Sequence, residues 1–287
     1  MNKYILGTVQ MGLDYGISNS SGKIPFEETC DILNTAYSNG IEMLDTAEAY
    51  GDAHKAIGDF HKRFPNIRFK IITKIPHSKL DNVEERIHLY LKDLNISTFE
   101  VLMFHSFDSY LLNADVIDFL VHLKEKEMVK HIGVSVYTNK QIEALLNDDR
   151  ITLIQLPFNL LDNEPIRGSL LQQLKNKGKI VHTRSAFLQG LFFKNASEKN
   201  ETYEKLATEI ETLKKIAKAE KTTISNLALS YCLSQKNIDH VLIGVDSVSQ
   251  LEENIKGSKY VITNKAISEI NAIKVADQDL LNPSLWK

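Results

Sequence analysis

Residues 43–51 read MLDTAEAYG, a short apolar run that stops at Asp45 and is followed by Tyr50 and Gly51. A continuous apolar run of this kind is typical of a strand that is buried on both faces. Such a strand has no structural need for a carboxylate at its end or for a phenol just beyond it. The two groups therefore indicate a functional site at the end of this strand.

Seven further apolar or β-branched runs occur along the chain, with helical patterns between them. They are YILG near residue 4, FKIITK near 71, EVLMF near 102, HIGVS near 133, TLIQL near 154, KIVHT near 181 and HVLIG near 242. Eight strands that alternate with helices predict an α/β fold, the (β/α)8 or TIM barrel, with eight parallel strands inside a ring of helices. Because no Pro-, Gly- or Ser-rich linker interrupts the chain, we expect a single domain over residues 1–287.

The helical segments carry start and stop signals. PFEETCDILNTAYSNG begins at Pro25 and ends at Gly40, which predicts a left-handed cap at the glycine. In DNVEERIHLYLKDLN, Asp81 is the expected N-cap, with Glu84 three residues later. Helices are also expected in ADVIDFLVHLKEKEMV, in PIRGSLLQQLKNKG and over residues 201–220.

Composition narrows the function classes. The chain has 287 residues, 43% of them hydrophobic, and a net charge of -3, with no basic run that alternates with aromatics. These values allow a sizeable core and argue against nucleic acid as a partner. No apolar stretch is long enough for a membrane span or a signal peptide, so we expect a cytoplasmic protein without membrane contact. Cys30 and Cys232 have no metal-ligand spacing, so buried thiols and no metal site are expected.

Two phosphate-binding motifs are missing. G-x-G-x-x-G follows none of the predicted strands, and Gly7 and Gly12 are not followed by the Lys of a P-loop. An open doubly wound sheet is therefore disfavoured relative to the barrel. Residues 16–23, GISNSSGK, are expected to form a flexible loop.

Polar side chains recur at the carboxyl ends of the predicted strands, where the active sites of such barrels lie. Singly, each has a structural explanation: Asp45 as a helix cap, His105 as a core histidine, Lys74 as a solvated charge and Tyr50 as packing. Their joint occurrence favours a functional interpretation. The strand ends in question are occupied by Asp45, Lys74, His105, Ser135 and Gln155.

Asp45, Tyr50, Lys74 and His105 form a coherent acid–base set. A Tyr hydroxyl has a pKa of about 10, and a nearby Lys74 ammonium would lower it by favouring the phenolate. Asp45 would keep Lys74 charged, and a neutral His105 could donate a hydrogen bond to a substrate oxygen. This set can protonate a carbonyl oxygen but supplies no electrons, so a hydride donor is required.

These residues resemble the aldo-keto reductases over nearly the whole chain. DTAEAYGDAHKAIG is similar to the family's D-T-A-x-x-Y-G segment, and IITK and LMFH carry the Lys and His of its catalytic tetrad. LGTVQMG is similar to the first barrel strand, and LIGVDSVSQLEENI to the late cofactor-binding segment. The resemblance implies an NAD(P)H-dependent oxidoreductase that reduces an aldehyde or ketone. Tyr50 would be the proton donor, Lys74 and Asp45 would tune it, and His105 would orient the carbonyl.

The resemblance also implies a cofactor-binding set. Ser135 and Gln155 match positions that hold the nicotinamide carboxamide, and SAFLQG, residues 185–190, matches the loop around the pyrophosphate. Val136 stands where many members have Asn, and Arg184 stands where an aromatic ring commonly stacks on the nicotinamide. The implied set is Gly7, Thr8, Asp45, Ser135, Gln155, Arg184, Ser185, Phe187, Leu188, Gln189, Gly190, Gly244, Asp246, Ser247, Gln250, Glu253 and Asn254.

The choice between the two nicotinamide cofactors has opposing signals. Many members bind the 2′-phosphate of NADP with a Lys and an Arg, whose positions here hold Gly244 and Gln250. Asp246 lies close by, and an acid favours the free ribose hydroxyl of NAD. The habit of the family favours NADP(H) slightly, with NAD(H) as the alternative.

The chain stops at NPSLWK, without the long closing loop of some relatives. We therefore expect an open pocket for a polar or sugar-derived carbonyl substrate. Separately, a monomer or weak homo-oligomer is expected. Trp286 either covers the pocket rim or, as expected for a terminal segment, packs on the surface.

Two other function classes stay open from sequence. A non-catalytic nucleotide-binding barrel, acting as a sensor or subunit, would be expected to have lost part of the tetrad. A barrel lyase would use Lys74 as a Schiff base, which needs a depressed Lys pKa that Asp45 opposes.

Overall fold

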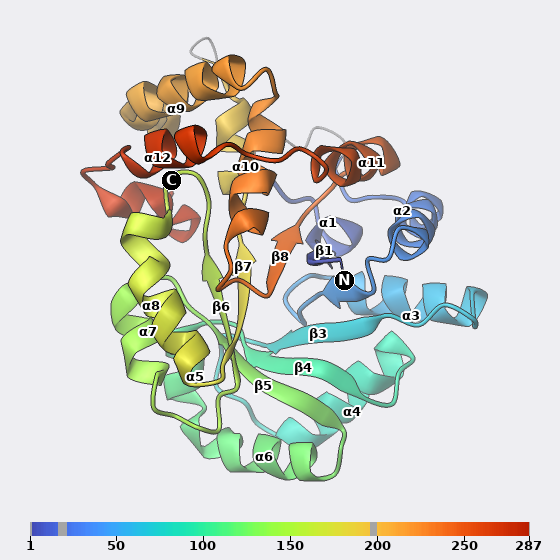
Figure 1. Cartoon of the computed structure of the whole chain (residues 1–287). Helices are drawn as coiled ribbons and strands as arrows, with labels where there is room; N and C mark the ends of the chain where they lie inside the picture. The colour runs from blue at the N-terminus through green and yellow to red at the C-terminus, as the bar shows by residue number, and fades with distance from the viewer. Residues whose placement is uncertain (1, 17–21, 196–199, 287) are drawn as a thin grey trace.

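Eight parallel strands close into a barrel, in a computed structural model that describes residues 2–16, 22–195 and 200–286 (Figure 1). Neighbours along the chain pair in order, and the first strand closes the ring against the last, with Tyr4 opposite Val241. The predicted (β/α)8 architecture is confirmed. The strands are β1 Tyr4–Gly7, β2 Met43–Asp45, β3 Lys70–Ile75, β4 Phe99–Phe104, β5 Val129–Ser135, β6 Leu153–Pro157, β7 Ile180–Arg184 and β8 His240–Ile243.

Helices surround the barrel and connect its strands (Figure 1). The α-helices are α1 Val9–Gly12, α2 Phe26–Ser38, α3 Ala53–Arg63, α4 Val83–Leu94, α5 Phe107–Leu112, α6 Ile117–Glu125, α7 Asn139–Leu145, α8 Glu164–Asn176, α9 Glu201–Ala219, α10 Ile224–Ser234, α11 Val248–Gly257 and α12 Asn264–Asn271. Four short 3-10 helices are η1 Ala114–Val116, η2 Leu188–Phe193, η3 Gln278–Leu281 and η4 Pro283–Leu285.

The predicted helix ends are confirmed in one case and wrong in another. Helix α2 follows Pro25, and Gly40 beyond its end has φ +77, as predicted for a left-handed cap. Asp81 is not the N-cap of α4. Asn82 holds that position in a left-handed conformation and makes no side-chain cap bond. Asn tolerates a positive φ better than most residues. Asn82 therefore suits this position because of its backbone conformation and not because of a capping hydrogen bond.

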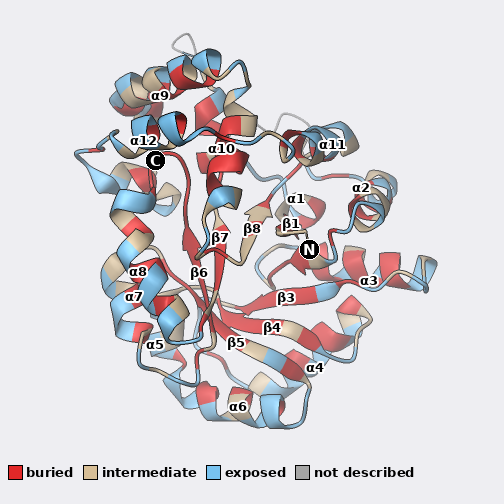
Figure 2. Ribbon diagram, viewed as in Figure 1, coloured by how far each residue is buried: buried red, intermediate tan, exposed pale blue. Residues whose placement is uncertain are grey.

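The core has two layers separated by the strands. One face of each strand packs against the helices, whose buried and exposed residues alternate along each helix (Figure 2). The opposite face fills the barrel interior with apolar side chains, because successive strand residues point to opposite sides. This inner cluster contains Ile5, Ile72, Val101, Met103 and Leu153.

Three further expectations concern the cysteines, the loop over residues 16–23 and membrane spans. Cys30 and Cys232 are free and buried, as expected. Residues 17–21, the middle of the expected loop, lie outside the described residues. Over the described part of the chain, no helix is both long and apolar enough to cross a membrane.

Buried histidines make the fold sensitive to acid. His54 is 6% exposed, and its Nε2 lies 2.8 Å from the Thr73 hydroxyl. Burial, with the Lys74 charge adding to it, lowers the pKa of His54 to about 4. The unfolded chain binds a proton at this histidine below about pH 6.5, whereas the folded state does not bind it until about pH 4. The contribution of neutral His54 to the free energy of unfolding is therefore fully present above about pH 6.5 and is lost as the pH falls toward 4.

We expect the free energy of unfolding to decline on acidification, with His54 contributing about 2 kcal/mol of the loss between pH 7 and pH 5. His54→Gln removes this titration and keeps a polar partner for Thr73, so its unfolding free energy should vary less with pH. Urea unfolding at both pH values measures the difference. His88→Gln, at a solvated site, is the control, and an equal pH response of the two variants would contradict the assignment to His54.

Candidate active site

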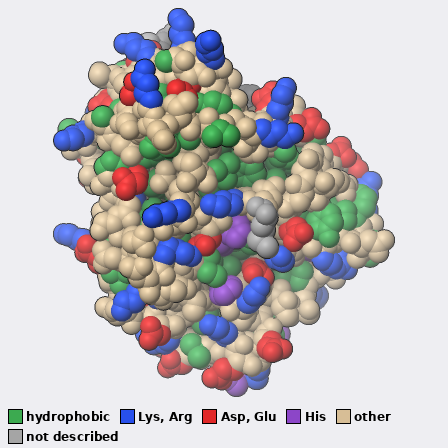
Figure 3. Space-filling view, viewed as in Figure 1, with side chains coloured by type: hydrophobic (Ala, Val, Ile, Leu, Met, Phe, Trp, Pro, Cys, Tyr) green, Lys and Arg blue, Asp and Glu red, His purple; other side chains and the backbone are tan. Residues whose placement is uncertain are grey.

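A cavity of about 910 Å³ opens where the carboxyl ends of the strands meet. Its size lies at the upper end of the range for small-molecule sites. Figure 3 shows a hollow on this face, in which histidine side chains lie among acidic and basic ones. The four predicted catalytic residues all line the cavity: Asp45, Tyr50, Lys74 and His105.

Lys74 is the centre of a hydrogen-bonded group at the base of the cavity. Its ammonium donates to the Asp45 carboxylate, to the Thr46 carbonyl at 3.0 Å and to the Tyr50 hydroxyl at 3.4 Å. The second Asp45 oxygen accepts a hydrogen bond from the Gln155 amide at 2.8 Å. Strands β2, β3 and β6 thus fix one buried ion pair and aim it at the phenol.

Burial and charge act in opposite directions on this group. Burial raises the pKa of Tyr50, and the Lys74 charge lowers it only in part. The expectation of a lowered pKa therefore holds for the contribution of Lys74 but not for the net shift. Burial by itself would lower the pKa of Lys74, yet the Asp45 charge and the phenol leave it raised. A lysine held as ammonium is unsuited to Schiff-base formation.

His105 faces Tyr50 across the site. The two ring centroids are 5.7 Å apart in an edge-to-face arrangement, and His77 stacks on His105 at 4.4 Å. Burial lowers the pKa of His105 to about 2, and the charges of Lys74, His77 and Arg184 add to the effect. The imidazole is therefore neutral near pH 7, as a hydrogen-bonding group for a substrate oxygen requires.

Gly12 sets the position of Tyr50. A Cβ at Gly12 would lie 1.8 Å from the Tyr50 carbonyl oxygen and 2.6 Å from the Ala53 nitrogen, so only glycine lets α1 approach this turn. The Tyr50 carbonyl accepts a hydrogen bond from Ala53 at the start of α3. The first βα loop therefore supports the second one beneath the phenol.

The residues implied for cofactor binding line the cavity, with two exceptions. Leu188 is fully buried in the core, and Ser247 caps α11 by accepting from the Gln250 nitrogen. Val136, in the place of the family's Asn, is also buried and does not line the cavity. The members that do line it are Gly7, Thr8, Asp45, Ser135, Gln155, Arg184, Ser185, Phe187, Gln189, Gly190, Gly244, Asp246, Gln250, Glu253 and Asn254.

The loop after β7 has an unusual backbone. Ser185, Leu188 and Gln189 have φ values of +62, +47 and +53, all in the left-handed region. Each such residue costs on the order of 1–3 kcal/mol, and such residues cluster at ligand clamps. This strain accompanies the segment for which the resemblance implies a phosphate contact.

Several lining residues were not found from sequence. They are Gln10, Tyr15, His77 and Tyr137. The buried Oε1 of Gln10 has no hydrogen-bond partner among the described residues. The Tyr15 hydroxyl accepts a hydrogen bond from the Gln189 amide at 2.9 Å. None of them ends a predicted strand, and a polar residue at a strand end is the pattern that indicates the site in the sequence. Among the described residues, no group of three His, Cys, Asp or Glu side chains could hold a metal ion.

The C-terminal segment forms part of the cavity wall. Residues 282–285 line the cavity, so this short tail contributes to its wall. Trp286 does not line it. Its indole donates to the Leu280 carbonyl at 3.0 Å and packs against the core, as the surface-packing alternative predicts. The short η3 and η4 helices turn the chain back toward the barrel mouth.

Comparisons with known proteins agree with this fold. L-galactose dehydrogenase of Arabidopsis thaliana is 24% identical over 289 aligned positions, which cover 92% of this chain and 89% of that protein. NADH-specific methylglyoxal reductase of Escherichia coli (strain K12) is 21% identical over 274 positions, covering 82% and 84%. An aldo-keto reductase from Bacillus halodurans, solved in its holo form, superposes with a TM-score of 0.76 at 17% identity and covers 96% of this chain and 93% of that one. The family model described as "Aldo/keto reductase family" matches residues 3–275, and the chain therefore belongs to the aldo/keto reductase family of oxidoreductases.

Proposed function

We propose that the protein is a nicotinamide-dependent carbonyl reductase in which Tyr50 protonates the substrate oxygen. The observation that carries the proposal is the Lys74 ammonium, which is shared between the Asp45 carboxylate and the Tyr50 hydroxyl in a cavity that His105 also faces. The bound cofactor would supply the hydride that reduces the carbonyl carbon. Intact Asp45, Tyr50, Lys74 and His105 speak against a sensor or subunit that has lost catalysis.

The chain's own residues account for the proton transfer. As negative charge develops on the carbonyl oxygen, Tyr50 gives up its proton and becomes a phenolate beside Lys74. A pair of opposite charges about 4 Å apart is worth on the order of 4 kcal/mol at an effective dielectric constant of 20, enough to offset much of the cost of a buried phenolate. Asp45 keeps Lys74 protonated throughout, and neutral His105 orients the oxygen without competing for the proton.

The cavity wall fits a dinucleotide. Two buried polar atoms, Gln10 Oε1 and Asp246 Oδ1, have no partner among the described residues, and both side chains line the cavity. They are suited to accept hydrogen bonds from a ligand. The strained loop after β7 supplies backbone beside the same wall. We propose that this loop holds the pyrophosphate and that residues after β8 hold the adenosine end.

We further propose that the cofactor is NAD(H), against the family habit noted above. Among the described residues that line the cavity, the Lys and Arg side chains are limited to Lys74 and Arg184. Both lie at strand ends and not in the segment after β8. That segment instead presents Asp246, Gln250 and Glu253. A 2′-phosphate placed there would meet acids and no cation, whereas a free hydroxyl can donate to a carboxylate.

NADH is expected to bind about tenfold more tightly than NADPH, which corresponds to roughly 1.4 kcal/mol. Gln250→Arg adds a cation at the cavity and should narrow or reverse the preference. Calorimetric titration of both reduced cofactors measures this. Ser249→Arg adds the same charge at an exposed neighbour outside the cavity as a control, and tighter binding of NADPH by the unaltered protein would refute the assignment.

Substrate class is tested by following the nicotinamide absorbance with NADH and a panel of aldehydes. We propose a polar or sugar-derived carbonyl compound, in line with the hydrogen-bonding lining and with the name of the plant relative, L-galactose dehydrogenase. Sugar-like aldehydes should give higher kcat/KM than aromatic aldehydes of similar size. Absence of cofactor oxidation across the whole panel would count against a reductase.

A further inference from the structure

Arg184, the last residue of β7, is a cation of the cavity wall that forms no ion pair with a described carboxylate. Its guanidinium donates to the Val136 carbonyl at 3.2 Å and to the Ser185 hydroxyl at 3.4 Å. Its Cζ lies 4.1 Å from the centroid of the Tyr137 ring. None of the ion pairs between described side chains includes Arg184.

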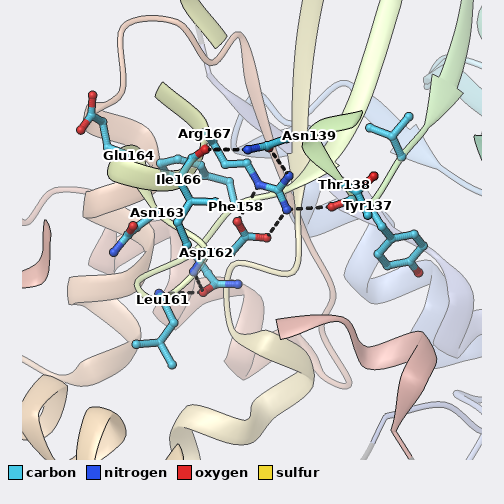
Figure 4. A network of polar contacts seen from close by, with 12 residues as sticks. Tyr137, Thr138, Asn139, Phe158, Leu161, Asp162, Asn163, Glu164, Ile166 and Arg167 are labelled. Carbon is cyan, nitrogen blue, oxygen red and sulfur yellow. Dashed lines mark hydrogen bonds and ion pairs between the residues drawn. The ribbon is translucent and has the colours of Figure 1, made fainter. Parts of the chain in front are cut away.

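A buried network holds Tyr137 in place beneath this guanidinium (Figure 4). Arg167 donates to the Tyr137 carbonyl at 2.7 Å and to the Asn139 side chain at 2.7 Å. Its other contacts are two hydrogen bonds to Asp162, at 2.6 and 2.8 Å. Asp162, only 1% exposed, thus forms its ion pair with Arg167. Burial raises the pKa of Asp162, and the charges of Arg167 and, to a smaller extent, of Arg184 oppose that rise.

The two other basic groups of the reacting centre are paired or neutral. Lys74 is paired with Asp45, and burial keeps His105 neutral. Burial is the main influence on both groups, raising the pKa of Tyr50 and lowering that of His105. The charge of Arg184 makes a smaller contribution that lowers both pKa values, so this charge acts at the reacting centre. Among the described side chains, Arg184 therefore adds a positive charge to this part of the cavity that no ion pair offsets.

We propose that Arg184 makes this pocket discriminate between the oxidation states of the cofactor, binding the uncharged dihydronicotinamide more tightly than the positively charged oxidised ring. The inference rests on the proposed reductase function. A hydride donor must reach the carbon whose oxygen Tyr50 protonates, so its ring shares this part of the cavity with Arg184. Like charges repel strongly in such a partly desolvated site.

The charge balance of the reaction determines how Arg184 affects the release of the oxidised cofactor. A bound dihydronicotinamide would supply a hydride, with its two electrons, to the carbonyl carbon, and Tyr50 would supply the proton. The alcohol would then leave neutral, and the oxidised ring would carry a positive charge that Arg184 disfavours. Oxidised cofactor is therefore released readily and inhibits weakly, which favours turnover in the direction of reduction.

Binding measurements on Arg184 variants test this without reliance on turnover. The experiment compares Kd values for NADH, NAD⁺ and ADP-ribose, the last of which lacks the nicotinamide. The proteins compared are the unaltered protein, Arg184→Met and Arg184→Lys. The ratio of Kd for NAD⁺ to Kd for NADH should be about tenfold or more in the unaltered protein and fall about tenfold in Arg184→Met, through tighter NAD⁺ binding. It should persist in Arg184→Lys, and ADP-ribose should bind alike to all three.

Each alternative outcome has its own meaning. An unchanged ratio in Arg184→Met, or an equal fall in Arg184→Lys, would overturn the charge argument. Weaker binding of all three ligands by Arg184→Met would identify Arg184 as a phosphate contact instead. Arg184→Gln carries the same expectation if the Met variant does not fold. Failure of the unaltered protein to bind either NADH or NAD⁺ would refute the proposed function itself, whereas equal affinities with normal turnover would refute only the role of Arg184.

Discussion

Tyr50→Phe is expected to lower kcat by roughly 10²–10⁴-fold, the usual contribution of a general acid, while leaving the Kd for NADH nearly unchanged. The ring and its edge contact with His105 persist in Phe, and only the proton and the hydrogen bond to Lys74 are lost. Steady-state kinetics with a reactive aldehyde measures kcat, and calorimetry measures cofactor binding on the same preparation.

The matched control for this substitution is Tyr110→Phe. Tyr110 donates to Asp148 at 2.7 Å outside the cavity, so the same loss of a hydroxyl should leave kcat intact. Near-normal turnover by Tyr50→Phe would show that another group, or water, donates the proton. Loss of NADH binding together with kcat would instead mean that the phenol organises the pocket.

Lys74→Met is expected to reduce both stability and catalysis. It leaves the Asp45 carboxylate, 2% exposed, without its cation, and breaking a buried pair in this way costs about 3–5 kcal/mol of unfolding free energy. It also removes the charge that stabilises the Tyr50 phenolate. Denaturant unfolding measures the first effect and kcat the second.

A double variant separates these two effects. Asp45→Asn with Lys74→Met removes both charges, so most of the lost stability should return while kcat stays low. Lys79→Met breaks the exposed pair with Asp115 and should cost no more than about 1 kcal/mol, as a control for the loss of a surface ion pair. Recovery of turnover in the double variant would exclude Lys74 as the group that supports the phenolate.

Much of the barrel could be predicted from local patterns. A strand buried on both faces needs a continuous apolar run, and eight such runs appear in the order in which the strands pair. The strand ends were less accurate: β3 continues to Ile75, β4 stops before His105, and β6 continues past Gln155 to Pro157. Hydrogen bonding to the neighbouring strands decides where a strand ends, and the register of that pairing cannot be predicted from the residues of the strand alone.

The tail illustrates a second limit of local patterns. A short polar C-terminal segment carries no periodicity that would place it, and its contact with the barrel mouth depends on how η3 and η4 turn. Leu188 shows the same limit in a motif: it lies within the implied phosphate loop, but the positive φ values of that loop turn its side chain into the core.

The sequence by itself determined the barrel, the order of its strands and the presence of a carboxylate, a phenol, an ammonium and an imidazole at its carboxyl end. Only the tertiary structure decided that Gln155 bonds to Asp45, that Tyr15 meets Gln189 and that Arg167 supports Tyr137. The reason is physical. Local periodicity reports which face of its own element a residue occupies, whereas these contacts, and the burial that sets the pKa of His105, arise only when the ring of strands closes.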